Sequence, residues 1–392
     1  MNILSISSIL PQINDFVFEF YGHYLKEINS DHVFYILPVK YNNKLIRKFA
    51  ADEFDDKEIT GLKEFFYKDY KISILKYIST WRYCNLHALL SVSLFFLNRK
   101  KIDSLIKIRN IKVVHAQNIF PDGMLAYYIM KKYHIPYIIT SHNELRYFSH
   151  YLSKRLSLKI FRNAYLITPL NYMNYQVFLK NNLKNLEHIP LGFNDKFLRL
   201  ERKYSNGTVK IITVARLVRL KNIDKVIYAL NKLGDKYNFE YTIVGDGPEK
   251  EYLTSLVNQY GMQDKIRFTG KIPHQKIADV LCEHDIFIMP SYFETFGRVY
   301  FEAMALRLPV ICARNSGIYG FFEEMKEGIS VDHNNISEIA EKLQLLISDD
   351  SLRQEIGNNG YELVKKYTWK NLAIKYHSIY NNSINNQESD PV

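Results

Sequence analysis

Two glutamates surround an expected helix start in the segment from Pro290 to Met304, which reads Pro-Ser-Tyr-Phe-Glu-Thr-Phe-Gly-Arg-Val-Tyr-Phe-Glu-Ala-Met. The apolar run Ile286–Met289 predicts a strand before it, and Gly297 marks the point where a helix should open. Free N–H groups and the helix dipole make such a start an anion site. Carboxylates cannot usefully bind phosphate, but they accept hydrogen bonds from hydroxyls. The segment therefore outlines a nucleotide-sugar site, with Glu294 and Glu302 as hydroxyl acceptors.

The backbone amides of this predicted anion site are those of Phe296, Gly297, Arg298 and Val299. Spacing alone favours a plainer interpretation, in which Glu294 is an N-cap and Glu302 is a charge on the helix surface.

A pair of cations follows the first expected strand of the second half of the chain. Arg216 and Lys221 come after the run Val209–Val214, in a turn that leads into a helix. The guanidinium is a planar fork and the ammonium is a point charge, and both suit a diphosphate. The chain has no Asp-x-Asp motif, so a metal-held diphosphate lacks obvious ligands and we expect no metal ion.

Two further turns and two histidines end expected strands. The turns read Gly245-Asp-Gly247-Pro and Gly270-Lys-Ile272-Pro, and a Gly-x-Gly alone is usually only a tight turn. In the first half, His115 and His142 lie at the ends of successive strand candidates. A lone histidine is more often structural than catalytic, but two at successive strand ends favour a site.

The spacing Glu294-x7-Glu302, followed by Ala303-Met-Ala and Leu308-Pro-Val310, resembles the signature of family 4 GT-B retaining glycosyltransferases, the glycosyl transferases group 1. This resemblance is strong from about Val209 to Asp332 and looser before Lys112. It implies that Glu294 holds hydroxyls of the donor sugar and Glu302 holds the ribose. It also implies that transfer retains the anomeric configuration and needs no cofactor beyond a nucleoside-diphosphate sugar as co-substrate.

The resemblance assigns roles to the remaining candidates. Arg216 and Lys221 would bind the donor diphosphate and stabilise its charge as the nucleotide leaves. Gly245 and Gly247 would line the nucleotide site, and Ile272 would contact the base through its backbone.

In the first half, the resemblance places His142 close to an outer hydroxyl of the donor sugar, and His115 matches a histidine found in many members. Many members also carry Gly-Gly in the loop after the first strand. Here that loop has no glycine, and Asn14 or Gln12 is a candidate for sugar or acceptor contact in its place.

The elements that must position these residues alternate between short β-branched runs and longer helix-like segments, which predicts parallel sheets covered by helices. We expect an α/β protein of GT-B type, with two Rossmann-like domains whose sheets face a central cleft. The predicted domains are an acceptor-side domain, 1–192, and a nucleotide-sugar domain, 193–369, with a helix at about 370–385 packing back on the first. The segment 40–76 is charged and aromatic, and we expect a loop and helices there. The strand candidates are Asn2–Ser7, His32–Val39, Lys112–Ala116, Tyr137–Ser141, Tyr165–Thr168, Glu187–Pro190, Val209–Val214, Tyr241–Val244, Ile266–Phe268, Ile286–Met289, Pro309–Cys312 and Ile329–Val331.

Composition and charge restrict the kinds of partner that the chain is expected to bind. The 392 residues include 52 Lys plus Arg and 41 Asp plus Glu, which gives a formal charge of +11. No nucleic-acid-binding motif appears, so we expect no nucleic acid. Basic residues cluster at Arg99–Lys112, and basic and aromatic residues interleave at Tyr147–Arg162, which favours contact of this part of the chain with an anionic membrane surface. The three scattered cysteines and the absence of a secretory leader predict a cytoplasmic protein, peripheral on the inner face of the membrane at most.

The sequence thus predicts a hexosyltransferase that uses a nucleoside-diphosphate sugar, UDP rather than GDP, and a glycan or lipid-linked acceptor in bacterial surface polysaccharide synthesis. Two alternatives stay open at this point. One is a catalytically silent GT-B subunit that supports a partner transferase, and the other is a sugar-nucleotide epimerase on the same architecture.

Overall fold

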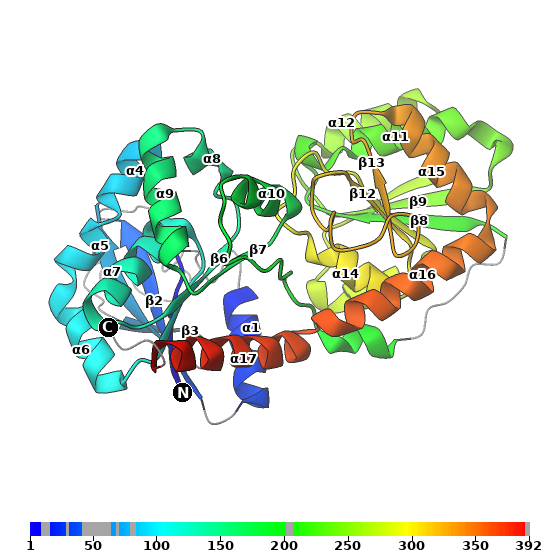
Figure 1. Cartoon of the computed structure of the whole chain (residues 1–392). Coiled ribbons are helices and arrows are strands. Elements are labelled where there is room, and N and C mark those ends of the chain that lie inside the picture. Colours follow the sequence, from blue (N-terminus) through cyan, green and yellow to red (C-terminus); the bar gives the residue numbers. More distant parts are fainter. Residues whose placement is uncertain are drawn as a thin grey trace. The chain divides into compact units, whose positions relative to one another are not determined.

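The computed structural model describes residues 1–8, 16–28, 31–40, 64–67, 70–78, 84–200 and 207–388. Its residues form two compact units (Figure 1). Unit 1 contains residues 1–170, 174–189 and 369–392, and unit 2 contains residues 171–173 and 190–368. The chain therefore passes from unit 1 to unit 2 between Ile189 and Pro190, three residues before the predicted boundary, and its last helix belongs to unit 1.

Unit 1 is built on a seven-stranded sheet of order β3-β4-β2-β1-β5-β6-β7. All neighbouring strands run parallel except β3 and β4, which pair antiparallel. The strands are β1 (Asn2–Ile6), β2 (His32–Lys40), β3 (Glu64–Tyr67), β4 (Tyr70–Tyr77), β5 (Val113–Ala116), β6 (Tyr137–Ser141) and β7 (Leu166–Pro169).

Two sequence predictions for unit 1 were wrong. Within the segment 40–76 we expected a loop and helices, but β3 and β4 extend the sheet beyond β2. Residues 41–63 lie outside the described residues. The predicted strand Glu187–Pro190 is replaced by an isolated bridge between Ile167 and Leu186.

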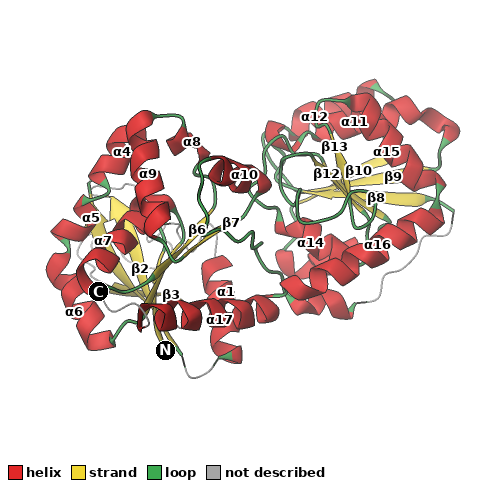
Figure 2. Cartoon of the chain, viewed as in Figure 1, coloured by secondary structure: helices red, strands yellow, loops and turns green. Residues whose placement is uncertain are grey.

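Helices cover both faces of the unit 1 sheet (Figures 1 and 2). On one face, helices α4 to α9 bury a continuous apolar core against Leu4, Ile6 and Val114. On the other face, α1 packs against α17. The helices are α1 (Phe16–Glu27), α4 (Cys84–Leu90), α5 (Ser93–Leu97), α6 (Arg99–Arg109), α7 (Met124–Tyr133), α8 (Leu145–Phe148), α9 (Tyr151–Asn163), α10 (Tyr172–Lys180) and α17 (Trp369–Glu388), with a π-helical turn η1 (Ile119–Gly123).

Unit 2 is a six-stranded parallel sheet of order β10-β9-β8-β11-β12-β13. This is the doubly wound arrangement. Successive strands from β8 to β10 are added toward one edge of the sheet, and those from β11 to β13 are added toward the other edge. The strands are β8 (Val209–Val214), β9 (Phe239–Val244), β10 (Ile266–Gly270), β11 (Ile286–Met289), β12 (Val310–Ala313) and β13 (Ile329–Val331).

Neighbouring residues along these strands alternate between two apolar cores. Ile211 belongs to the core under α11, α12 and α15, whereas Ile212 belongs to the core under α13 and α14. Helix α11 packs on the core that contains Ile211 through one apolar face. On this face Ile223, Val226, Ile227 and Leu230 recur at helical spacing and are all buried. The helices are α11 (Ile223–Leu233), α12 (Lys250–Gln259), α13 (Ile277–Leu281), α14 (Arg298–Ala305), α15 (Ile336–Ser348) and α16 (Asp350–Val364), with short 3₁₀ turns η2 (Asp195–Arg199), η3 (Arg219–Lys221), η4 (Gly234–Lys236), η5 (His274–Lys276) and η6 (Lys365–Tyr367).

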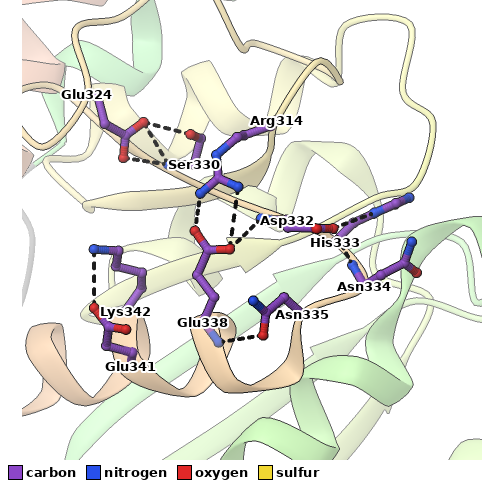
Figure 3. Close-up of polar contacts among 10 residues, drawn as sticks. All are labelled: Arg314, Glu324, Ser330, Asp332, His333, Asn334, Asn335, Glu338, Glu341 and Lys342. Carbon is purple, nitrogen blue, oxygen red and sulfur yellow. Dashed lines mark hydrogen bonds and ion pairs between the residues drawn. The ribbon is translucent and has the colours of Figure 1, made fainter.

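A chain of polar contacts fixes the start of α15 against the ends of β12 and β13 (Figure 3). The Asn335 side chain caps α15 by accepting the Glu338 amide at 3.1 Å. The Glu338 carboxylate in turn accepts the Asp332 amide at 3.1 Å and pairs with Arg314, which directly follows β12. These contacts anchor the first residue of the loop that leads from β12 to β13.

No helix among the described residues is both long enough and apolar enough to cross a membrane.

Candidate active site

The loops that follow β8 and β11 meet at the switch point of the unit 2 sheet, where ligands of open α/β sheets bind. The Tyr292 amide donates to the Leu220 carbonyl at 2.8 Å. The Asn222 side chain donates to the Pro290 carbonyl at 2.9 Å, and its backbone takes the left-handed conformation with φ 51°. These bonds hold the turn that carries the predicted cations against the loop that carries Glu294.

Lys221 and Glu294 form an ion pair across these two loops. Each side chain is only 18% exposed. A third loop closes on the same point, because the Gly317 amide after β12 donates to the Glu294 carbonyl at 3.1 Å. The structure therefore brings together the residue predicted to bind the diphosphate and the residue predicted to hold the donor sugar.

Helix α14 opens immediately after this pair. Gly297 is its N-cap, with φ 78° and ψ 70°. A Cβ at Gly297 would lie 2.8 Å from the Tyr300 ring and 3.0 Å from Cγ of Glu294, so only glycine fits without a shift. The Phe296 side chain is buried in the core against Phe301, which leaves only its backbone for a ligand. Arg298 and Val299 begin the helix, where backbone N–H groups have no acceptor within the helix.

Glu302 lies on α14 and is almost completely buried, with a side chain 4% exposed. His274, the first residue of η5, approaches it with Nε2 at 2.9 Å from Oε1. The carboxylate accepts and the imidazole N–H donates. The plainer interpretation of Glu302 as a charge on the helix surface is therefore wrong.

The turns after β8, β9 and β10 are joined through their backbones. The Leu217 amide donates to the Asp246 carbonyl at 3.0 Å, and the Gly245 amide donates to the Gly270 carbonyl at 2.9 Å. A Cβ at Gly247 would lie 2.3 Å from the Leu217 carbonyl oxygen, so this turn packs directly on the one that holds the cations. Ile272, two residues after β10, is half-buried and packs beside the core under α14.

Arg216 lies in the same turn as Lys221 and is exposed. Within the part of the chain that the structure describes, no carboxylate pairs with its guanidinium. Arg219, by contrast, is 91% exposed and points toward Glu249, with Nε 3.8 Å from Oε2. Arg216 is thus the second cation of the turn that is available to an anion.

His142 directly follows β6 at the carboxyl edge of the unit 1 sheet and is buried. Burial lowers its pKa to about 3, so the imidazole is neutral at ordinary pH. Asn174 of α10 fixes this strand end by donating to the Ser141 hydroxyl at 3.1 Å and to the His142 carbonyl at 3.2 Å.

His115 contacts buried hydroxyl groups through both of its ring nitrogens. Its Nδ1 lies 2.7 Å from the Tyr380 hydroxyl and 3.0 Å from that of Tyr21, and its Nε2 lies 2.8 Å from the Thr140 hydroxyl. Burial, with a smaller contribution from His142, lowers its pKa to about 3. Both ring nitrogens already bond buried protein groups, so this arrangement does not support a contact of His115 with sugar or acceptor. Gln12 and Asn14 lie outside the described residues.

Two buried acids at the same sheet edge were missed by the sequence analysis. Asp122 accepts from the Ser8 amide at 3.0 Å, and Glu144 accepts from the Ser141 hydroxyl at 2.5 Å. Burial raises the pKa of each to about 7. They tie the loops after β1, β5 and β6 together. An Asp beside a Gly and a Glu two residues after His142 carry no distinctive signal in one sequence.

Across the described ranges, no three His, Cys, Asp or Glu side chains gather in a way that could hold a metal ion.

Comparison with known proteins identifies glycosyltransferases as relatives of this chain. Residues 197–363 match the family model of glycosyl transferases group 1. An uncharacterized glycosyltransferase of Methanocaldococcus jannaschii is 26% identical over 298 residues, which span 73% of this chain and 80% of that protein. The putative teichuronic acid biosynthesis glycosyltransferase TuaC of Bacillus subtilis is 26% identical over 273 residues, 64% of this chain and 66% of its own.

Among solved structures, HepE of Anabaena in complex with UDP superimposes with a TM-score of 0.71 at 15% identity, covering 97% of this chain and 100% of that one. At that identity the likeness shows the fold, which is GT-B. The chain is therefore a glycosyltransferase with the GT-B fold, and its residues 197–363 belong to the family glycosyl transferases group 1.

Proposed function

We propose that this enzyme moves a hexose-type sugar from a nucleoside-diphosphate sugar, UDP rather than GDP, to a glycan or lipid-linked acceptor, with retention of configuration and without a metal ion. The observation that carries the proposal is the pair Lys221–Glu294 at the start of α14. A cation, a hydroxyl acceptor and a helix start are the groups that a diphosphate and its attached sugar need side by side.

The donor diphosphate is held by Lys221, Arg216 and the first amides of α14. When the bond between the sugar C1 and the phosphate oxygen breaks, negative charge grows on that oxygen. Two cations and the positive end of a helix dipole stabilise this charge as it develops, which lowers the barrier to departure. These groups do the work that a divalent ion does in metal-dependent transferases, which is the basis for proposing metal independence.

Retention follows if the acceptor oxygen bonds to C1 from the face that the diphosphate leaves. The departing phosphate oxygen then takes the acceptor proton, so the enzyme needs no separate base. Glu294 accepts hydroxyls of the sugar ring and fixes its orientation, which is where positioning contributes to the rate. His142 is neutral because its pKa is about 3, and a neutral imidazole suits a hydrogen bond to a sugar hydroxyl.

The relatives support the donor and acceptor classes. HepE was solved with UDP, which favours a uridine nucleotide. TuaC is named for teichuronic acid synthesis, which favours a surface polysaccharide as the product to which sugar is added.

The direct test is transfer or hydrolysis by the purified chain with a panel of UDP- and GDP-sugars in the presence of a chelator. We expect turnover with at least one UDP-sugar, and an α-linked donor should give an α-linked product by proton NMR. Lys221→Ala should lower kcat/KM by about 10²–10³-fold, the usual loss when one donor of charge stabilisation is removed. Glu294→Ala should lower it comparably, whereas Arg219→Ala, a neighbouring exposed cation, serves as the matched control. Full activity of both site variants would refute the assigned roles.

We also propose contact with an anionic membrane surface through the helices on one face of unit 1. On α5 and α6, Phe96 is 57% exposed and Ile108 is 73% exposed, and Lys100 and Lys101 lie exposed on α6. Exposed apolar side chains beside cations suit a bilayer interface, because the apolar groups can insert among the lipids while the cations contact anionic headgroups.

Flotation with phosphatidylglycerol vesicles tests this contact. We expect salt-sensitive binding that is lost in the double variant Lys100→Glu, Lys101→Glu and kept in a control with the same charge change in unit 2, Lys236→Glu, Lys250→Glu. Equal flotation with phosphatidylcholine vesicles, or none with either, would contradict the proposal.

A further inference from the structure

Glu302 is a carboxylate that the fold has almost removed from water. Its side chain is 4% exposed, and its neighbours on α14, Phe301 and Ala303, are fully buried in the core. A carboxylate in such a place is costly unless hydrogen bonds compensate it. Among the described residues, His274 is the side chain that bonds it, with Nε2 2.9 Å from Oε1.

His274 is itself held in place by the turn that follows β10. Its ring packs against Phe197, which is fully buried, with ring centroids 6.3 Å apart. The preceding Pro273 fixes the backbone at φ −57° as η5 begins. Gly270 anchors the start of this turn by accepting the Gly245 amide. The imidazole is 48% exposed, so one part of the ring faces solvent while another part packs against Phe197.

This arrangement gives the carboxylate a defined orientation. The imidazole N–H takes Oε1, which fixes the rotation of the carboxylate and leaves Oε2 to accept a hydrogen bond from a ligand. A carboxylate accepts several hydrogen bonds, and the two neighbouring hydroxyls of a ribose offer two donors within one contact.

We propose that His274 is a positioning residue for the nucleotide and acts through Glu302. By orienting this carboxylate toward the ribose, it makes the site favour ribonucleotides over nucleotides that lack the ribose hydroxyls. The inference rests on the proposed function, because it assigns the Glu302 carboxylate to the ribose of a donor nucleotide. It also joins the turn containing Ile272, the residue predicted to contact the base, to the helix that begins at the diphosphate.

The experiment measures binding of UDP and of 2′,3′-dideoxyuridine diphosphate by calorimetry to the full chain and three variants. His274→Ala removes the donor, His274→Gln keeps an N–H near the position of Nε2, and Gln275→Ala changes an exposed neighbour as the matched control. A hydrogen bond to a charged group is worth about 10-fold or more in affinity. We therefore expect His274→Ala to weaken UDP binding ~10-fold and to leave dideoxy binding within about 2-fold of wild type.

We expect His274→Gln to bind UDP close to the wild-type level, because its amide N–H can still donate to Glu302. If the imidazole ring had only a structural role, its removal in His274→Gln would weaken UDP binding as well. If His274→Ala fails to fold, His274→Asn, whose shorter amide cannot reach Oε1, takes its place in the same comparison.

An equal loss of affinity for UDP and the dideoxy nucleotide would overturn the inference, because the effect would not pass through the ribose hydroxyls. Unchanged UDP binding by His274→Ala would overturn it as well. If the wild-type chain binds neither UDP nor GDP, the proposed nucleotide site itself fails, and the role of His274 falls with it. Wild-type UDP binding with no dependence on His274 would leave the proposed function intact and reject only this inference.

Discussion

Replacing Gly245 by alanine tests whether the turns that carry the donor-binding cations are as tightly joined as the structure shows. A Cβ at this position would lie 1.8 Å from the Ala215 carbonyl oxygen and 2.9 Å from the Ala215 carbonyl carbon. These atoms belong to the backbone of the turn that contains Arg216, so relief requires the turn itself to move. The φ of 139° adds a conformation that side-chain-bearing residues rarely adopt.

The expected cost has two parts. Forcing a non-glycine residue into a positive-φ conformation costs about 1–3 kcal/mol. Overpacking a close contact adds about 1–3 kcal/mol. Together they predict that Gly245→Ala loses about 2–6 kcal/mol of unfolding free energy. Gly261 provides the matched control, because it has φ 63° but nothing within 4 Å of an added Cβ. Gly261→Ala should therefore lose only the conformational part, about 1–3 kcal/mol.

Urea denaturation followed by circular dichroism measures the difference, and UDP calorimetry measures its effect on the site. Gly245→Ala should unfold at clearly lower urea than Gly261→Ala. It should also bind UDP more weakly, because the displaced turn carries Arg216 and leads into Lys221. Equal midpoints for the two variants would show that the turn absorbs the methyl group without strain, and would refute the steric reasoning.

Three more outcomes follow from contacts in the two units. Asn335→Ala should lose about 1 kcal/mol of stability by uncapping α15, whereas Asn334→Ala should be near neutral; equal losses would contradict the cap at Asn335. Tyr380→Phe should cost about 1 kcal/mol through its lost bond to His115, and an unchanged urea midpoint would argue against that bond. Asp122 has a pKa raised to about 7 by burial, so the folded protein holds its proton below that pH and the wild type loses stability as the pH rises from about 4 to 7. Asp122→Asn lacks this loss, so its stability relative to wild type should increase across that range and level off above it; a constant difference in a series of urea titrations would exclude a raised pKa.

Much of the unit 2 sheet could be predicted because its strands are short runs of apolar residues bounded by turns. All six predicted strands of unit 2 are present, with ends within about two residues. The missed strand β4 shows the opposite case. Ile72 and Ile74 are buried and Lys71 is exposed, which is strand periodicity, but charged and aromatic residues around it obscured the pattern.

The candidate site could be predicted only where its residues follow a motif. The pair of glutamates and the pair of cations have fixed spacings along the chain, and the structure brings Lys221 and Glu294 together. His274 could not be found in this way, because its partner Glu302 is 28 residues away and the contact depends on how two loops fold. The partners of His115 could not be predicted either, because its position at a strand end carries no information about the groups from α1, β6 and α17 that its ring contacts.

Because α17 belongs to unit 1, that unit is assembled from segments at both ends of the polypeptide. A ribosome that has released residues 1–189 has not yet made the helix that supplies Tyr376 and Tyr380 to the interior around His115. Unit 2, from Pro190 to Thr368, is nearly continuous and can complete its core first. During translation, unit 2 should therefore complete its fold before unit 1, although most of unit 1 is synthesised first. Unit 1 can complete its fold only after α17 has been made.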